Sequence, residues 1–145
     1  MLTERFKIIP ATHLLLIRNG KILLLKRANT GFYDGSYGVV AGHLDGGETA
    51  TSAMIREAKE ECGISLNSEN LKMVHAMHRK SSEERVDFFF MATEWDGEPI
   101  NTEKNKCDDL SWFFLNNLPN NMVPYVKHGI VNFNNGVLFS EFGWD

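Results

Sequence analysis

Residues 42–64, GHLDGGETATSAMIREAKEECGI, contain the pattern from which the fold and the chemistry of this chain are best approached. Good helix formers fill the second half, and a glycine follows them, so we predict a helix over residues 49–62. Glu57, Glu60 and Glu61 stand at i, i+3 and i+4, within an arc of about 100° on that helix. Like charges so placed repel by roughly a few tenths of a kcal/mol per pair. They also lie near the negative end of the helix dipole, which disfavours acids.

A divalent cation would turn this repulsion into attraction. Hard cations such as Mg²⁺ prefer oxygen ligands, commonly a few carboxylates together with water and substrate phosphate. Without further context, an ordinary solvated helix face with Arg56 paired to Glu60 would explain the same letters. The residues around the helix favour the metal site over that explanation.

The spacing of residues 42–64 resembles the signature box of the Nudix hydrolases. All seven fixed letters match, and the only departure is Ala58, where a larger aliphatic residue is usual. The matched positions are Gly42, Glu48, Arg56, Glu57, Glu60, Glu61 and Gly63. Further similarity on both sides of the box covers most of the chain.

The resemblance implies an enzyme that cleaves a nucleoside diphosphate linked to another group, within an α/β/α sandwich that contains a mixed β-sheet. Glu57, Glu60 and Glu61 would ligate Mg²⁺ or Mn²⁺. Water would attack a phosphorus of the diphosphate, with Glu57, Glu60 and Arg56 as the catalytic residues of the box.

The other box positions would support these groups. Arg56 would hold an acid in orientation, because its planar fork suits a carboxylate. Glu48 would brace the loop or the start of the helix. Gly42 and Gly63 would be backbone positions at which a side chain does not fit.

The resemblance leaves the general base open. Glu57 or Glu60 are the candidates inside the box. Outside it, Glu103, Asp108 and Asp109 are candidates, although each is also explained as a solvated turn residue.

Candidates for substrate binding lie mainly in the glycine-rich residues 28–47 and at their edges. Arg27 could meet a phosphate, although a surface cation would look the same. Phe32, Tyr33 and Tyr37 could stack on a base, but aromatic side chains are core residues by default. His43 and Asp109 complete the substrate candidates, whereas His13, His75 and His78 are predicted to be packed or surface groups. We expect Cys62 to be core.

The remaining sequence predicts mostly strands. Asn19-Gly20 between two apolar runs predicts a hairpin over residues 13–27. Further strands are predicted at 37–41, 71–79, 85–95 and 110–115, a helix at 124–133, and a strand or extended tail at 136–144. Two helices and many strands indicate a mixed sheet covered by helices, of the α/β or α+β class.

Length and composition set further limits. The 145 residues predict a single domain, 1–145, and a net charge of −4 predicts no affinity for nucleic acid or an anionic membrane. Two cysteines cannot build a disulfide framework, and no apolar run is long enough to span a bilayer. We therefore expect a cytoplasmic protein with a small nucleotide substrate, and leave a homodimer open.

Three functions are compatible with these features. The first is a metal-dependent diphosphatase of a nucleoside triphosphate, with ADP-ribose, a dinucleotide polyphosphate or a nucleotide sugar as other substrates of the same chemistry. The second is an isomerase of a diphosphate ester, which would need a catalytic Cys in a hydrophobic pocket. The third is a non-catalytic nucleotide-binding regulator, in which some box acids should have been lost.

Overall fold

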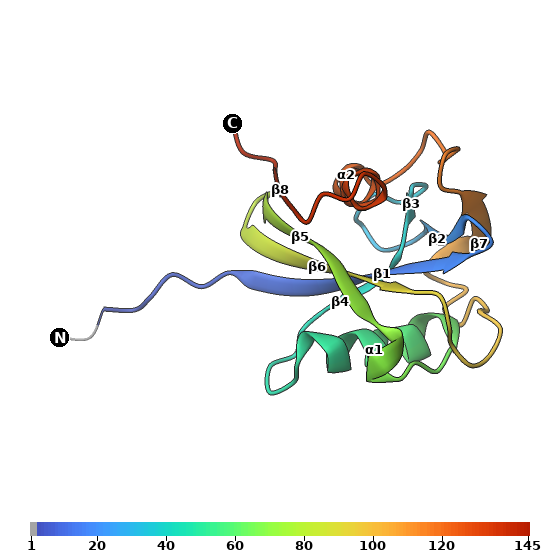
Figure 1. Ribbon diagram of the computed structural model, residues 1–145. Helices are drawn as coiled ribbons and strands as arrows, with labels where there is room; N and C mark the ends of the chain where they lie inside the picture. The colour runs from blue at the N-terminus through green and yellow to red at the C-terminus, as the bar shows by residue number, and fades with distance from the viewer. Residues whose placement is uncertain (1–2) are drawn as a thin grey trace.

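The computed structural model describes residues 3–145, which form a mixed sheet between two helices. Helix α1 (Ala50–Cys62) covers one face and helix α2 (Pro124–Asn134) the other, as Figure 1 shows. The strands are β1 (Ile9–Arg18), β2 (Lys21–Arg27), β3 (Tyr37–Gly38), β4 (Val40–His43), β5 (Lys72–Lys80), β6 (Glu84–Ala92), β7 (Cys107–Phe114) and β8 (Phe139–Phe142), and one 3₁₀ turn spans Ser68–Asn70. This is the predicted α/β/α arrangement.

The sheet follows the order β3-β2-β1-β6-β5-β8, with β4 also on β1 and β7 also on β2. Strand β1 runs parallel to β6 over most of its length and antiparallel to β4 over residues 11–14. Only its last two residues, Ile17 and Arg18, pair with β2. Because β1 joins two groups of strands in this way, it brings β4, and the residues that begin the box, to the middle of the molecule.

The predicted hairpin turn is confirmed, since Asn19 and Gly20 have φ values of 53° and 75°. Two boundaries differ from the prediction. Strand β1 begins at Ile9 rather than at residue 13, because its first residues pair with β6. The strand predicted at 37–41 is divided into β3 and β4 at Val39, because β3 pairs with β2 whereas β4 pairs with β1.

Strand β7 begins at Cys107, three residues before the predicted start. The polar sequence Cys107-Asp108-Asp109 carries little strand signal, but it pairs with the end of β2 through a register shift between Lys26 and Arg27. The predicted second helix is confirmed as α2, and the C-terminal stretch forms β8, which pairs in parallel with β5.

The core is divided by the sheet into two clusters. On the α1 side, Met54, Ala58 and Cys62 are fully buried, so the prediction for Cys62 is confirmed. On the α2 side, Ile130 packs with Phe89, and the space at Gly129 is taken by the Phe89 ring. Each such large apolar side chain contributes about 1.5–3 kcal/mol through burial. The buried side chains of α1 therefore fix the position of this helix on the sheet.

Local signals set both ends of α1. Thr49 is the N-cap, with its Oγ1 accepting a hydrogen bond from the Ser52 N–H at 3.0 Å. Gly63 ends the helix at φ 75°, and its N–H donates to the Lys59 carbonyl at 3.1 Å. A residue with a Cβ would be strained at this φ. A Cβ at position 63 would meet no atom closer than 3.5 Å, so glycine is favoured there by its backbone conformation and not, as predicted, by lack of space.

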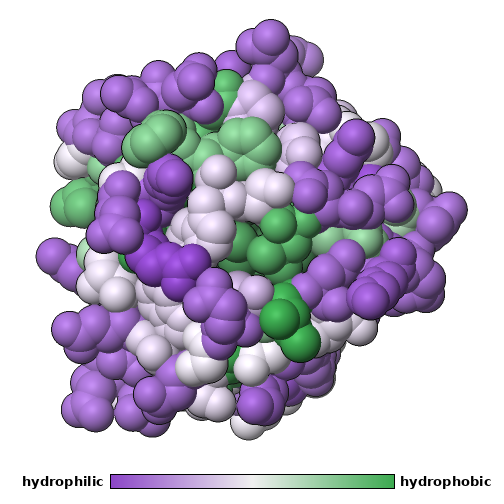
Figure 2. All heavy atoms as spheres, turned by 90° about the vertical axis from the view of Figure 1, so that its right-hand side faces the viewer, coloured by the Kyte–Doolittle hydropathy of each residue, from purple (hydrophilic) through white to green (hydrophobic). Residues whose placement is uncertain are grey.

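Among residues 3–145, apolar side chains form no extended face on the side where β7 lies (Figure 2). Figure 2 views the molecule from the right-hand side of Figure 1, and small apolar patches there are surrounded by hydrophilic residues. Within residues 3–145, neither helix is long and apolar enough to cross a membrane.

Candidate active site

The backbone of β4 and the first acid of helix α1 lie in direct contact. A Cβ built on Gly42 would overlap the carboxylate of Glu57, which occupies the space that the missing side chain leaves. The side chain of Glu57 is only 13% exposed. The absence of a side chain at position 42 thus allows an acid of α1 to lie flat against the sheet.

Arg56 links the helix acids to the loop before the helix. Its Nη1 donates to Glu57 Oε1 at 2.8 Å, and its Nη2 donates to Glu48 Oε1 at 2.8 Å. The same Glu48 oxygen accepts the Asp45 N–H at 2.9 Å. The hydrogen bond from Arg56 lowers the pKa of Glu48 and raises that of Arg56 itself. Arg56 is therefore placed to orient the Glu57 carboxylate, and Glu48 is placed to hold the loop before the helix. The ion pair between Arg56 and Glu60, which a solvated helix face would also show, is longer, at 3.6 Å.

Glu61 points from α1 back toward the sheet. Its Oε1 accepts the Ala41 N–H at 3.5 Å. The pKa of Glu61 is raised to about 9, chiefly by burial and in addition by a hydrogen bond to Glu57 and the charge of that residue. With no cation nearby, the Glu61 carboxyl would keep its proton at neutral pH. A pair of acids held together in this way is a candidate functional site.

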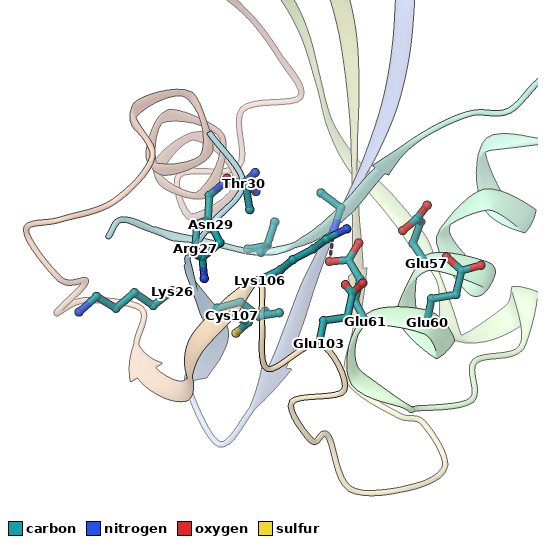
Figure 3. Close-up of a pocket in the computed structure, with 14 residues that line it drawn as sticks. Lys26, Arg27, Asn29, Thr30, Glu57, Glu60, Glu61, Glu103, Lys106 and Cys107 are labelled. Atoms are coloured by element: carbon teal, nitrogen blue, oxygen red, sulfur yellow. Dashed lines mark hydrogen bonds between the residues drawn. The ribbon is translucent and has the colours of Figure 1, made fainter. Parts of the chain in front are cut away.

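These acids face a cavity of about 450 Å³ between α1 and the ends of β2 and β7 (Figure 3). Glu57, Glu60 and Glu61 line its helix side, together with Glu103 from the loop before β7. Figure 3 shows Lys106 reaching across the cavity toward Glu61. The cavity thus combines carboxylates, which suit a cation, with cations, which suit a phosphate.

The donor set fits a hard divalent cation, because four carboxylates supply only oxygen ligands. The side chains are not already gathered around one point: among residues 3–145, no three His, Cys, Asp or Glu side chains converge as a metal-binding group. Glu57 is engaged by Arg56, and the Glu60 side chain is 58% exposed. Binding a cation would therefore require these carboxylates to turn toward it.

The substrate candidates divide into two groups. Arg27, Phe32 and His43 line a second cavity that adjoins the first, and Arg27 lines both. Tyr37 and Asp109 line neither cavity. Instead the Tyr37 hydroxyl donates to Asp109 Oδ2 at 2.6 Å, and this hydrogen bond raises the pKa of Tyr37 to about 12. The two side chains are therefore hydrogen-bonded to one another, outside the cavity that the acids of the box line.

Several residues of the site were not among the predicted ones. Lys106 lines the first cavity, and Arg79 and Arg85 line the second. Cys107, whose neighbours in the sequence are polar, is a buried residue that begins β7 and lines the first cavity. The available signal for the second cavity was Asp87, a charged residue inside the apolar strand sequence of β6.

The structure combines an α/β/α sandwich with an acid-rich helix that faces a cavity, and Lys and Arg side chains line the same cavity. These features together indicate a class of protein suited to phosphate chemistry. The family model described as NUDIX domain matches residues 7–132, so the chain belongs to the NUDIX family. This finding confirms the resemblance that the sequence carries.

Similar proteins include a MutT NUDIX hydrolase of Burkholderia pseudomallei, whose crystal structure matches with a TM-score of 0.79. The match has 26% identity and covers 87% of this chain and 98% of that one. The NAD-capped RNA hydrolase NudC of Chromobacterium violaceum is 30% identical over 126 residues, or 86% of this chain. The ADP-ribose pyrophosphatase of Methanocaldococcus jannaschii is 31% identical over 102 residues, or 70% of this chain. The chain spans only 45% and 59% of the lengths of these two relatives.

Proposed function

We propose that this protein is a metal-dependent pyrophosphohydrolase that cleaves a nucleoside triphosphate or another nucleoside diphosphate-linked small molecule. One observation carries the proposal: Glu57, Glu60 and Glu61 of the box face Arg27 and Lys106 across one cavity of about 450 Å³. Carboxylates and cations on opposite walls suit a ligand that is itself a phosphate bound to a metal ion.

In this proposal Glu57, Glu60 and Glu61 hold Mg²⁺ or Mn²⁺, with Glu103 within reach of the same cavity. A cation held by these residues would neutralise charge on the phosphates and would make water in the cavity a stronger nucleophile. Arg56 keeps Glu57 oriented through the hydrogen bond at 2.8 Å. Arg27 and Lys106 bind phosphate oxygens from the other wall.

The reaction is attack of a water oxygen on one phosphorus of the diphosphate. A new P–O bond forms as the bridging P–O bond breaks, and the bridging oxygen leaves on the second phosphate. The water proton passes to a carboxylate that acts as general base. Glu57, Glu60 and Glu103 line the cavity and are the candidates, whereas Asp108 is exposed and lines neither cavity.

The relatives support this chemistry through their names. One is called an ADP-ribose pyrophosphatase and another an NAD-capped RNA hydrolase. Because the chain spans part of each relative, ADP-ribose and NAD serve here as members of a test panel. The acidic net charge of −4 favours a small substrate over RNA. Two free, buried cysteines are in keeping with the reducing cytoplasm expected from the sequence.

One observation favours a second candidate, an isomerase of a diphosphate ester, because Cys107 lines the cavity. Burial raises the pKa of the Cys107 thiol, however, and its Sγ donates to the Asp109 carbonyl at 3.2 Å. The same cavity is lined mainly by charged and polar residues, with only Leu25, Val39 and Ala41 as apolar side chains beside the cysteine. Hydrolysis is therefore the better match, and retention of every box acid favours it over a non-catalytic regulator.

The test is a panel of nucleoside triphosphates, ADP-ribose, NAD, dinucleotide polyphosphates and nucleotide sugars, incubated with and without Mg²⁺ or Mn²⁺. We expect release of a nucleoside monophosphate from at least one member, only with the metal and reduced by Glu60→Gln. Isomerised diphosphate esters without phosphate release would favour the second candidate. If no member of the panel yields a product, the proposal is wrong.

A further inference from the structure

The loop before β7, residues 100–106, is fixed to the C-terminal end of α1. The last four carbonyl groups of a helix have no partner within that helix. In α1 this loop supplies partners for two of them. The Ile100 N–H donates to the Cys62 carbonyl at 3.0 Å. The Thr102 hydroxyl donates through Oγ1 to the Glu60 carbonyl at 2.5 Å.

The same loop is also fixed to the chain that follows β2. The Ala28 N–H donates to the Lys106 carbonyl at 2.9 Å, and Asn29 Nδ2 donates to the Asn105 carbonyl at 2.8 Å. The loop therefore joins α1 to the end of β2 along one side of the first cavity. Glu103 and Lys106 are its two residues that line this cavity.

Glu103 is the acid that the loop turns inward. It is half-buried, whereas its neighbours Thr102 and Lys104 are exposed. Figure 3 shows Glu103 beside Glu61 at the cavity. The pKa of Glu61 is raised chiefly by burial, and the charge of Glu103 adds to this rise. Two charged carboxylates so placed repel, so a loop that was free to move would turn Glu103 toward water.

Asn101 fixes the backbone of Glu103 within the loop. Its Oδ1 accepts the Glu103 N–H at 3.1 Å, and its Nδ2 donates to the Cys107 carbonyl at 2.7 Å. The Glu103 carbonyl accepts the N–H of Lys106 at 2.8 Å and the N–H of Cys107 at 2.9 Å. Both backbone polar groups of Glu103 are thus bonded inside the loop, and these bonds hold the acid in place against the repulsion.

We propose that Thr102 and Asn101 are positioning residues that together hold the Glu103 carboxylate at the cavity. Thr102 ties the loop to the last turn of α1, and Asn101 ties Glu103 to the loop. Because Glu60 lies in that turn, the two bonds set where Glu103 stands relative to the acids of the box. Neither Thr102 nor Asn101 lines the cavity. The proposal rests on the proposed function, in which Glu103 is a candidate general base.

The first measurement is amide hydrogen exchange, followed by NMR on the metal-free protein in EDTA. The reporters are the N–H groups of Lys106 and Cys107, which bond to the Glu103 carbonyl and to neither positioning side chain. Thr102→Val keeps the shape of the side chain but removes the hydroxyl, so both amides should exchange about fivefold faster. Asn101→Ala should have the same effect. Thr102→Ser keeps the hydroxyl and should exchange as the wild type does.

The second measurement is steady-state kinetics with the substrate and metal that the panel identifies. Thr102→Val should lower kcat about tenfold and leave KM within about twofold, because the acid is misplaced while the substrate contacts are kept. Thr102→Ser should keep kcat within about twofold of the wild type. In a Glu103→Gln background, Thr102→Val should lower kcat by less than about twofold more, since both changes act through the same carboxylate.

Two controls remove comparable groups elsewhere. Thr93→Val changes an exposed threonine that lines neither the first nor the second cavity. Asn132→Ala removes an amide that donates to the His128 carbonyl at 2.8 Å within α2. Both variants should keep the wild-type kcat and the wild-type exchange rates of Lys106 and Cys107.

The outcomes separate this proposal from the proposed function. Unchanged exchange in both Thr102→Val and Asn101→Ala would overturn it, because the loop would then keep its shape without these side chains. Faster exchange with wild-type kcat, or a loss of kcat that adds in full to that of Glu103→Gln, would also overturn it. If the wild type hydrolyses no member of the panel, the proposed function is wrong, and the exchange rates alone decide whether the two side chains fix Glu103.

Discussion

The carboxylate of Glu57 fills the space above the backbone of Gly42, so that a Cβ at position 42 would overlap it. Gly42 lies near the end of β4 and Glu57 lies on α1, in different elements of the fold. The contact restricts both positions: position 42 has no room for a side chain while the Glu57 carboxylate lies against it. A glycine is needed at position 42 for steric reasons alone, since its φ lies outside the left-handed range.

Gly42→Ala should therefore displace Glu57 from the sheet and disturb its bond with Arg56. We expect kcat to fall by about tenfold or more while the circular dichroism spectrum stays that of the wild type. Because both variants would act through the same carboxylate, the loss in Gly42→Ala/Glu57→Gln should not exceed that in Glu57→Gln. Additive losses would mean that Gly42 acts through another contact.

Glu60→Gln and Glu61→Gln should each lower turnover by about a hundredfold without unfolding the protein, because a cation ligand is lost. For Glu60, which is more than half exposed, no packing change is expected. Steady-state kinetics over a range of Mg²⁺ concentrations measures the effect. Glu69→Gln, at an exposed acid in the Ser68–Asn70 turn, is the matched control and should keep wild-type kinetics. Wild-type activity in Glu60→Gln and Glu61→Gln would exclude them as metal ligands.

The parts of the fold that depend on neighbouring residues were predictable from the sequence. The cap at Thr49, the glycine at position 63 and the Asn19-Gly20 turn each form through contacts within a few residues. For Gly42, the sequence analysis predicted that a side chain would not fit. It did not predict that the Glu57 carboxylate occupies that space.

What the sequence could not predict depends on distant pairing. Tyr37 and Asp109 were separate candidates for the substrate site, but the pairing of β2 with both β3 and β7 brings them to one another. Similarly, Asp87 meets His13 because β1 and β6 run in parallel, and meets Arg79 across the β5–β6 pair. No local pattern reports either register, so the only local sign of the second cavity was Asp87 within the apolar strand sequence of β6.

Glu61 makes the stability of the metal-free protein depend on pH. Its folded-state pKa of about 9 lies above the ordinary value of 4.5, so between these values the folded state holds a proton that the unfolded state releases. The free energy of unfolding should then decrease as pH rises from about 5 to 9. Urea denaturation in EDTA at pH 6, 7.5 and 9 measures this slope. Glu61→Gln should flatten it, and an unchanged slope in that variant would assign the pH dependence to other groups.

Divalent cations should stabilise the native state by mass action. At a free concentration about 100 times Kd, binding to the folded state alone adds about 2.7 kcal/mol to the free energy of unfolding. We expect the melting temperature to rise on addition of Mg²⁺ or Mn²⁺, and the rise to be reduced in Glu61→Gln. Sodium chloride of equal ionic strength is the control for screening. A melting temperature that responds equally to sodium and magnesium would argue against a specific site.

Glu103 is the acid outside the box that we expect to act as general base, because it lines the cavity with Glu57, Glu60 and Glu61. Glu103→Gln should lower kcat by about a hundredfold or more, in the range typical for loss of a general base, and should change KM little.

Asp108→Asn is the comparison for Glu103→Gln, since Asp108 is exposed in the same segment and lines neither cavity. It should keep kcat within about twofold of the wild type, because a solvated surface charge contributes little at this distance. If Glu103→Gln retains the turnover of the wild type, the proton passes to a box acid, Glu57 or Glu60. Loss of turnover in Asp108→Asn would instead mean that this exposed acid of β7 takes part in the reaction.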